Sequence, residues 1–450
     1  MLNGTNNQQV LNSITSFAKS GLHVLAGFLL LAVFLSTVAV AQSPPQAGAA
    51  HLDSVTVNGS KKFASGEIAS AVGLRAGTSI NRDDLQAAAD KLAALGLFSN
   101  VQFHFTTVES GVRATYEVAD APAIPVSFDN FPWFTDDELT AALKRSVLLF
   151  DGSAPQRGTI LDAMSGALEK LVQTRGVLGN VAHTLVNLPS GGQSMQFRVE
   201  GADLTVKSIE FSDALATSDH NIQQSASDLI GKPYSRSAVE LFEFEQVRPV
   251  YLAHAFLHVQ FGPPSARVTS DSQPASGGGV VVVAPVLAGP AYKWGGALWS
   301  GNSVTPTHDL NAMVDMKLGD VADGNKIAAL WERIRSLYGE HGYLDAKVDA
   351  DPQFYDQDAR VIYNVTITEG PQYRMGTLVL TGLSIDGEKR VRAAWSIPAD
   401  AIFNEKTYDD FLDAGIKRAF AGTPVHYDKV GRFLQENPGT GKVDVLLDFQ

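Results

Sequence analysis

Short runs of alternating apolar and polar residues are separated along this chain by stretches with helical spacing. The first run, Leu52 to Gly59, stops at an Asn-Gly pair, which is typical of a strand that ends in a turn. A later stretch places apolar residues on one helical face and ends at Gly96: Leu85, Ala88, Ala89, Leu92 and Leu95. Two more alternating runs follow, so the pattern predicts strand, helix, helix, strand, strand.

The same order of elements recurs along the chain with a period of roughly 80 residues, which suits small domains better than solenoid repeats. Gly96 to Val101 and Gly176 to Val181 both place Gly, a bulky apolar residue, Asn and Val at matching offsets. We therefore predict an α+β chain of five tandem β-α-α-β-β domains. Their predicted boundaries are 51–121, 122–202, 203–288, 289–369 and 370–450.

Two of the predicted domain junctions share a motif. Gly289-Pro290 and Gly370-Pro371 are each followed by Tyr and then Gly at the same offsets. Gly accepts a positive φ, and Pro fixes φ and removes a hydrogen-bond donor, so both pairs predict rigid turns. Short Gly-Pro junctions favour semi-rigid contacts between neighbours, and we expect an elongated, curved rod.

The N-terminal segment predicts export from the cytoplasm. An apolar run from Val24 to Val40 follows Lys19 and ends in Ala39-Val40-Ala41, the small-x-small pattern of a cleavage site before Gln42. We interpret residues 1–41 as a signal peptide and 42–50 as a linker. The alternative is an uncleaved membrane anchor, because the run approaches the roughly 20 residues that span a bilayer and a long polar segment precedes it.

Composition excludes several classes of function. The net charge of −13 argues against nucleic acid, whose phosphates require clustered Lys and Arg. The chain has no cysteine, which removes disulfides, thiolate metal sites and Cys nucleophiles. No nucleophile elbow or phosphate-binding loop follows a predicted strand. We therefore expect no enzyme activity, no cofactor and no metal.

Two residue groups nevertheless resemble functional sites. His254 and His258 lie four residues apart, as two metal ligands on a helix would, but without a Glu in the HExxH pattern we expect surface or turn histidines. Phe131-Pro132-Trp133-Phe134 has the composition of a partner-binding patch. We favour a packing role for it, either between the first two domains or as a hydrophobic staple onto the next helix.

The order of elements, together with two segments, resembles POTRA domains, the periplasmic modules of the Omp85 and surface-antigen (D15) outer-membrane assembly family. The most specific segments are Tyr338 to Val348, which contains His341-Gly342-Tyr343, and Val365 to Pro371, which ends in Glu-Gly-Pro. The resemblance covers essentially everything after residue 50. It implies that each domain is a three-stranded mixed sheet with two helices on one face.

The resemblance also implies a location and partners. Assembly proteins of this family continue into a β-barrel, whereas the last pattern here is the final strand of the fifth domain, so we expect no barrel and no insertion activity. We expect a periplasmic scaffold, associated with the outer membrane, whose partners are outer-membrane proteins or a separately encoded barrel or assembly component. The alternative is a cell-envelope adaptor of the division or secretion type, held at the inner membrane by an uncleaved Val24 to Val40 segment.

In the family such domains bind partners by pairing with an exposed edge strand, which by resemblance is the second strand of each domain. Backbone groups on an edge give affinity without requiring one particular sequence. The resulting candidate partner-binding residues are Val101, Phe103, Phe105, Val181, Val259, Phe261, Ala346, Val348 and Val425.

Overall fold

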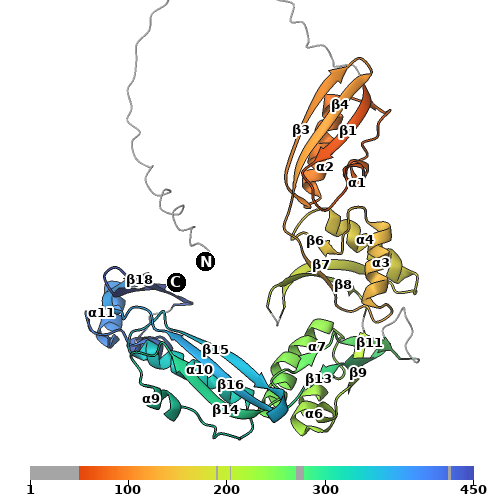
Figure 1. Ribbon diagram of the computed structural model, residues 1–450. Helices are drawn as coiled ribbons and strands as arrows, with labels where there is room; N and C mark the ends of the chain where they lie inside the picture. The colour runs from red at the N-terminus through yellow and green to blue at the C-terminus, as the bar shows by residue number, and fades with distance from the viewer. Residues whose placement is uncertain (1–49, 189–190, 203, 270–277, 424–426) are drawn as a thin grey trace, which may run out of the picture. The chain divides into compact units, whose positions relative to one another are not determined.

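The computed structural model of the protein describes residues 50–450 except 189–190, 203, 270–277 and 424–426 (Figure 1). The predicted signal peptide and residues 42–49 of the predicted linker lie outside the described residues. The first strand begins at Ala50.

Residues 50–120, which we call unit 1, build one small sheet with two helices. The elements are β1 (Ala50–Asn58), α1 (Ser65–Ala71), β2 (Ser79–Ile80), α2 (Arg82–Ala94), β3 (Phe98–Val108) and β4 (Gly111–Asp120). The strand order is β2-β1-β4-β3, with β1 parallel to β4 and β3 antiparallel to it. The last strand therefore lies in the middle of the sheet (Figure 1).

Unit 2 repeats this order, and unit 3 repeats it with an interrupted sheet. Unit 2 contains β5 (Ile124–Phe128), α3 (Asp136–Ser146), β6 (Ser153–Ala154), α4 (Ile160–Gln173), β7 (Asn180–Asn187) and β8 (Gln193–Glu200). Unit 3 contains β9 (Leu204–Phe211), α5 (Ala214–Ser218), α6 (His220–Ser227), α7 (Arg236–Phe242), the π-helical η1 (Glu243–Val247), α8 (Arg248–Ala253), β10 (Gln260–Phe261), β11 (Ser265–Val268), β12 (Gly278–Ala284) and β13 (Val286–Leu287).

Units 4 and 5 complete the described chain. Unit 4 contains β14 (Lys293–Ser300), α9 (Thr307–Ala312), α10 (Gly324–Glu340), β15 (Lys347–Tyr355), the short η2 (Asp356–Asp358) and β16 (Arg360–Thr368). Unit 5 contains β17 (Arg374–Thr381), α11 (Ile385–Ala394), α12 (Glu405–Asp410), the π-helical η3 (Phe411–Gly415), α13 (Ile416–Phe420), β18 (Val430–Asn437) and β19 (Lys442–Phe449). The predicted mixed α+β fold is confirmed.

One face of each sheet carries the helices and the core. Along β4, every second residue is buried, from Val112 to Val118, and the residues between them face away from the core. Ile68 of α1 and Leu85 of α2 belong to the same apolar cluster as Tyr116 of β4. The other face of the sheet is left to polar side chains, as a two-layer domain requires.

Unit 3 departs from the regular pattern because prolines interrupt its hairpin. Pro263 and Pro264 separate β10 from β11, and Pro285 separates β12 from β13 on the opposite strand. Proline cannot donate to a sheet ladder, so the pairing divides into a β11-β12-β9 sheet and a two-stranded β10-β13 ribbon. The buried residues of unit 3 accordingly form two clusters.

A close backbone contact ends the first strand of units 1, 4 and 5. Gly301, directly after β14, has a φ of +76°, and a β-carbon there would lie 2.2 Å from the carbonyl oxygen of Ile367. The equivalent glycines are Gly59 and Gly382, with φ of +96° and +79°. Only glycine fits both the conformation and the space.

We predict that Gly301→Ala weakens the β14–β16 pairing by roughly 1–3 kcal/mol, because the new methyl group collides with a backbone oxygen at a positive φ. Hydrogen–deuterium exchange of the β14 and β16 amides measures the loss. Gly66→Ala is the matched control, since Gly66 lies in α1 and a β-carbon added there would have nothing within 4 Å. If the two variants exchange alike, the close contact does not constrain the strand.

Candidate functional site

The strand that follows the second helix of each unit lies at an outer edge of its sheet, with its other side unpaired among the described residues. We keep the term second strand for it, leaving aside the two-residue strands β2 and β6. The structure places the candidate edge residues Val101, Phe103 and Phe105 in β3, Val181 in β7, Phe261 in β10 and Val348 in β15. Val259 and Ala346 are corrections: each lies directly before its strand, because the turn that leaves the preceding helix is longer than predicted. Val425 lies outside the described residues.

The first strand, at the opposite edge, is partly covered. β2 pairs with β1 and β6 pairs with β5. In the other three units a single bridge takes the same place, to Pro233, Val321 and Ile402. The second strand is therefore the freer edge, with backbone N–H and C=O groups available to another strand.

These edges differ in charge. β3 and β7 contain no proline and no Lys, Arg, Asp or Glu. β15 carries Lys347, Asp349, Asp351 and Pro352, and β18 carries Arg432 and Glu436. Charges and prolines are the usual protection of an edge against unwanted pairing, so β3 and β7 are the less protected strands.

Apolar side chains accompany the two uncharged edges. Phe103 stacks on the buried ring of Tyr116 at 5.6 Å between centroids, which fixes β3 against the core. Phe105 and Leu185 remain 41% and 40% exposed within β3 and β7. Each edge therefore combines free backbone groups with an exposed apolar side chain, the two features that strand addition uses.

The Gly-Pro motif forms equivalent junctions between units 3 and 4 and between units 4 and 5. Gly289 and Gly370 have φ of +72° and +73°. A β-carbon on Gly370 would lie 2.9 Å from the β-carbon of Asp345, and one on Gly289 would lie 3.3 Å from that of His258. Both junctions thus press against the turn that leaves the preceding unit's second helix.

The tyrosine of each motif continues this contact. Tyr373 N–H donates to Gly342 O at 2.7 Å, and Tyr292 N–H donates to Ala255 O at 3.1 Å. The Tyr373 hydroxyl donates to Asp345 at 2.8 Å. Burial, and then the neighbouring carboxylate of Asp345, raise the pKa of Tyr373 to about 12. The copied motif is therefore a copied joint between neighbouring units.

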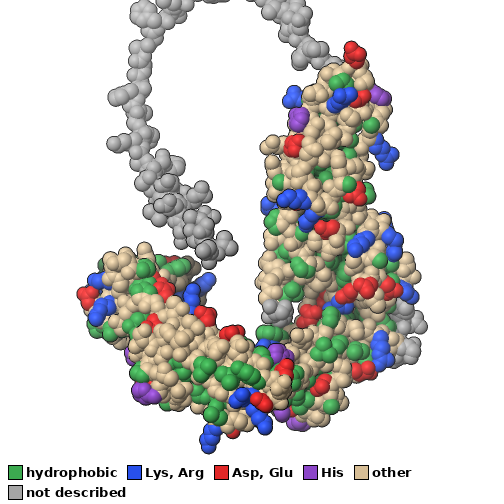
Figure 2. Space-filling view, viewed as in Figure 1, with side chains coloured by type: hydrophobic (Ala, Val, Ile, Leu, Met, Phe, Trp, Pro, Cys, Tyr) green, Lys and Arg blue, Asp and Glu red, His purple; other side chains and the backbone are tan. Residues whose placement is uncertain are grey.

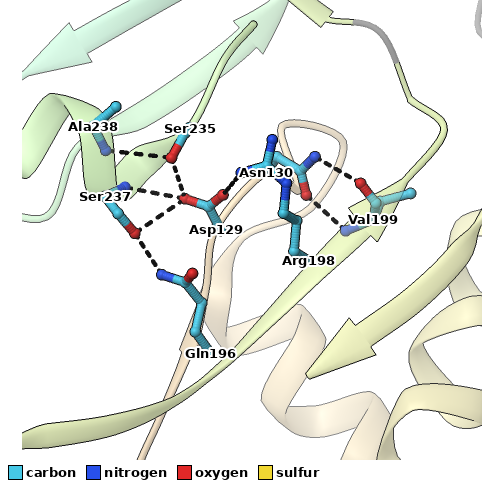
Figure 3. Close-up of polar contacts among 8 residues, drawn as sticks. All are labelled: Asp129, Asn130, Gln196, Arg198, Val199, Ser235, Ser237 and Ala238. Atoms are coloured by element: carbon cyan, nitrogen blue, oxygen red, sulfur yellow. Dashed lines mark hydrogen bonds and ion pairs between the residues drawn. The ribbon is translucent and has the colours of Figure 1, made fainter. Parts of the chain in front are cut away.

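A buried carboxylate joins units 2 and 3 in a different way (Figure 3). Asp129 is 1% exposed and follows β5 directly, at the position that glycine occupies in units 1, 4 and 5. Its Oδ2 accepts from Arg198 at 2.8 Å, within unit 2. Its Oδ1 accepts from the Ser235 hydroxyl at 2.9 Å and from the Ser237 amide at 3.0 Å, both in unit 3.

Further contacts surround Asp129. Arg236 donates through one guanidinium nitrogen to both carboxylate oxygens of Asp136 at 2.9 and 2.7 Å. Trp133 packs against the core shared by units 1 and 2 and also against one core cluster of unit 3. The Phe131–Phe134 segment is therefore a packing element, as favoured from the sequence, but Trp133 bridges units 2 and 3 rather than units 1 and 2.

Asp129 was not among the residues expected from the sequence. The available signal was an Asp-Asn pair between an apolar strand and Phe131. A polar pair with aromatic residues on both sides is more typical of a buried turn than of a turn that faces solvent. Asn130 is also buried and exchanges two hydrogen bonds with the backbone of Val199, at 2.9 and 2.7 Å.

His254 and His258 make separate contacts and do not form a shared site. The Nδ1 atom of His254 lies 2.9 Å from Val250 O, at the end of α8. The ring of His258 packs on Phe354 at 4.1 Å between centroids. In the part of the chain that the structure describes, no three His, Cys, Asp or Glu residues are grouped as metal ligands would be.

Two surface properties bear on partners. On the face drawn in Figure 2, Lys and Arg side chains are dispersed among acidic ones rather than gathered in one basic patch. Across residues 50–450, leaving aside the gaps, none of the helices has the length and apolar content needed to cross a bilayer.

Small α+β domains joined in tandem, each with a free edge strand, define a class of protein-interaction modules. The family model for POTRA, described as "Surface antigen variable number repeat", matches residues 50–120 and 292–370. Units 1 and 4 are therefore POTRA domains, and the resemblance noted from the sequence is confirmed. Units 2, 3 and 5 have the same order of strands in their sheets.

A curated relative shares half of the chain. It is a protein of Treponema pallidum (strain Nichols), provisionally named an outer membrane protein assembly factor, and is 19% identical over 229 residues. The match covers 50% of this chain and 27% of the relative, so it spans about a quarter of the relative's length.

Solved structures of low identity are also similar. POTRA domains 3–5 of BamA from Haemophilus influenzae are 18% identical and cover 55% of this chain and 96% of that one, with a TM-score of 0.45. The N-terminal domain of Omp85 from Thermosynechococcus elongatus is 12% identical and covers 89% of this chain and 96% of that one, with a TM-score of 0.19.

We predict that Asp129→Asn loosens the contact between units 2 and 3 by about 1–3 kcal/mol, because Arg198 and the Ser237 amide lose a charged acceptor. Faster hydrogen exchange at residues 196–199 and 235–240 reports the change. Asp137→Asn is the control, because Asp137 is exposed one residue beyond Asp136 in the same helix. Unchanged exchange in Asp129→Asn would show that apolar packing alone holds the joint.

At the joint between units 4 and 5, we predict that Tyr373→Phe costs about 0.5–1.5 kcal/mol through loss of its bond to Asp345. The raised pKa gives a pH dependence. The neutral tyrosine contributes fully to the stability of the joint below the ordinary tyrosine pKa of about 10, and this contribution is lost as the pH rises toward 12. Hydrogen exchange at residues 341–346, measured at pH 7 and pH 11, checks the cost of the substitution and its pH dependence. The control is Tyr355→Phe, because Tyr355 is exposed on β15. A cost that is equal at both pH values contradicts the prediction.

Proposed function

We propose that this chain is a non-catalytic periplasmic scaffold that binds partner or nascent outer-membrane proteins during their assembly or transport. The proposal rests on its POTRA domains and on the T. pallidum relative, which is itself named for outer membrane protein assembly. The observation that carries the binding mode is the pair of uncharged, proline-free edge strands, β3 and β7.

Strand addition is the physical mechanism. A partner segment that lies along β3 satisfies its own backbone N–H and C=O groups against those of the edge, whatever its side chains are. Nascent outer-membrane proteins are alternating chains that have not yet formed their sheets, so they present many such segments. Low sequence selectivity is an advantage for a scaffold that serves several clients.

The charges of the edge strands favour units 1 and 2 for this function. A strand added beside β15 would meet Asp349 and Asp351, and Pro352 lacks an amide hydrogen. β3 offers eleven residues and β7 eight residues without such obstacles. Units 4 and 5 would then serve to hold the binding units through their Gly-Pro joints.

The mechanism needs no cofactor and no nucleotide, which accords with the absence of phosphate-loop and nucleophile motifs from the sequence. The partners are outer-membrane proteins or another assembly component of the envelope. The periplasm is the compartment in which this chain and such clients meet.

We predict that a photo-crosslinking amino acid at Gln102 in β3 or Thr184 in β7 forms adducts with outer-membrane proteins in cells. The same group at Asp349 in β15 or at Asp90 in α2 should form several-fold fewer, because these positions lack a free uncharged edge. Immunoprecipitation and mass spectrometry identify the adducts. Equal adduct formation at all four positions would exclude the edges of β3 and β7 as the binding surface.

A second step separates pairing from mere proximity. Single prolines at Gln102 and at Phe103 remove neighbouring amides, one of which faces away from β4. The variant that loses the outward amide should keep its circular dichroism spectrum and lose most adducts, measured with the crosslinker at Thr106.

A further inference from the structure

Unit 3 contains a groove beside β10, the strand that holds the candidate edge residue Phe261. It has a volume of about 820 Å³, within the usual range for ligand sites. One wall is the second helix, through Glu240, Glu243, Phe244 and Arg248, and the other is the segment from Val259 to Pro264. Leu188 of unit 2 also lines the groove. The two walls are adjacent in the fold because β10 follows the helix after a short turn.

An irregular helix builds the first wall. Pro249 has no amide hydrogen, so a regular helix cannot continue through it without losing a bond. The helix makes a π-helical turn over η1, in which Arg248 N–H donates to Glu243 O, five residues earlier. The second helix of unit 5 makes an equivalent turn, η3, without a proline. Such turns widen a helix locally and are frequent at functional sites.

Glu243 is the unusual residue of this wall. It is 2% exposed, and its Oε1 atom has no hydrogen-bond partner among the described residues. Burial, and then the nearby Glu240 carboxylate, raise the pKa of Glu243 to about 8. A buried carboxyl without a partner destabilises a fold, so its presence in the wall of a groove indicates a ligand that supplies the missing partner.

The other charged groups of the groove do not supply a partner for the Glu243 carboxyl. Glu240 is a like charge, and burial raises its pKa as well. The Arg248 guanidinium lies over the Phe244 ring, 5.6 Å from its centroid, and within the described residues it forms no ion pair to either carboxylate. The segment from Val259 to Pro264 contains no titratable residue. The groove thus combines two carboxyls with an apolar opposite wall.

We propose that this groove binds an extended peptide segment that places a lysine or arginine side chain against Glu243, with apolar neighbours against Phe244 and Phe261. A cation supplies both the countercharge and the hydrogen-bond donors that the carboxyl lacks. The aliphatic stem of the same side chain matches the apolar walls. This site is distinct from β3 and β7 in unit and in chemistry, so it does not depend on pairing there.

The test uses the full chain and three labelled nine-residue peptides that alternate valine and threonine around a central lysine, methionine or glutamate. Fluorescence anisotropy at pH 7 should show the lysine peptide binding at least about tenfold more tightly than the methionine peptide. Glu243→Gln should remove that difference. Glu245→Gln is the matched control, because Glu245 is exposed in the same π-helical turn and should leave the difference intact.

A second readout follows the proton. Binding of a cation stabilises the ionised carboxylate, so the lysine peptide should release a proton at pH 7 from the native chain and not from Glu243→Gln. Calorimetry in two buffers of different ionisation enthalpy measures this. Phe244→Ala, which keeps the carboxyl, should weaken all three peptides alike.

Three outcomes overturn the proposal. If no peptide binds, the groove is not a peptide site. If lysine and methionine peptides bind equally and Glu243→Gln changes nothing, the groove takes apolar segments. If Glu243→Gln weakens every peptide equally, the carboxyl accepts backbone amides rather than a basic side chain. None of these results affects adduct formation at β3 or β7, so the two proposals fail separately.

Discussion

The parallel pairing between the first and last strand of each unit is the constraint on which the other features depend. Parallel neighbours cannot be joined by a tight turn, so each unit needs a long connection, and its two helices lie within that connection. The hairpin that follows inserts its last strand into the centre of the sheet. The second strand is thereby left at the edge, and the helices cover a single face. The topology therefore produces a free edge in every unit. The charges and prolines on each edge strand then decide whether another strand can pair with it.

Units 1 and 2 share one apolar core, and the later joints use two other kinds of chemistry. Units 3, 4 and 5 are connected through backbone contacts at the Gly-Pro motif, where glycine allows the close approach and the tyrosine amide donates to the preceding unit. Side-chain bonds such as that from Tyr373 to Asp345 accompany these contacts. Units 2 and 3 are connected through side chains, with the Asp129 carboxylate bridging both. A backbone joint tolerates changes in surrounding side chains, whereas a buried carboxylate requires each of its donors. The two uncharged edges lie in the units before the carboxylate joint.

Unit 3 is the least regular part of the chain, because prolines interrupt its sheet. Prolines in the hairpin remove backbone donors, so the sheet divides. The second helix widens through a π-helical turn, as the second helix of unit 5 also does. The core divides into two clusters as a result. The unpaired Glu243 carboxyl lies where the widened helix faces the broken strand. A regular unit with a continuous sheet and one core would leave less room for it.

Local patterns in the sequence determined the class of fold, the order of elements and the two Gly-Pro joints. Alternation, helical spacing and turn residues act over a few neighbours, so they can be recognised without knowing the tertiary structure. The first residues of β10 and β15 could not be recognised in this way, because Val259 and Ala346 belong to turns whose length depends on packing. The burial and the partners of Asp129 and Glu243 were also decided by the tertiary structure. Asp129 meets a serine 106 residues away, and Glu243 is buried by a segment beyond the end of its own helix. Burial and partners of a charged side chain depend on such distant contacts, which no local pattern encodes.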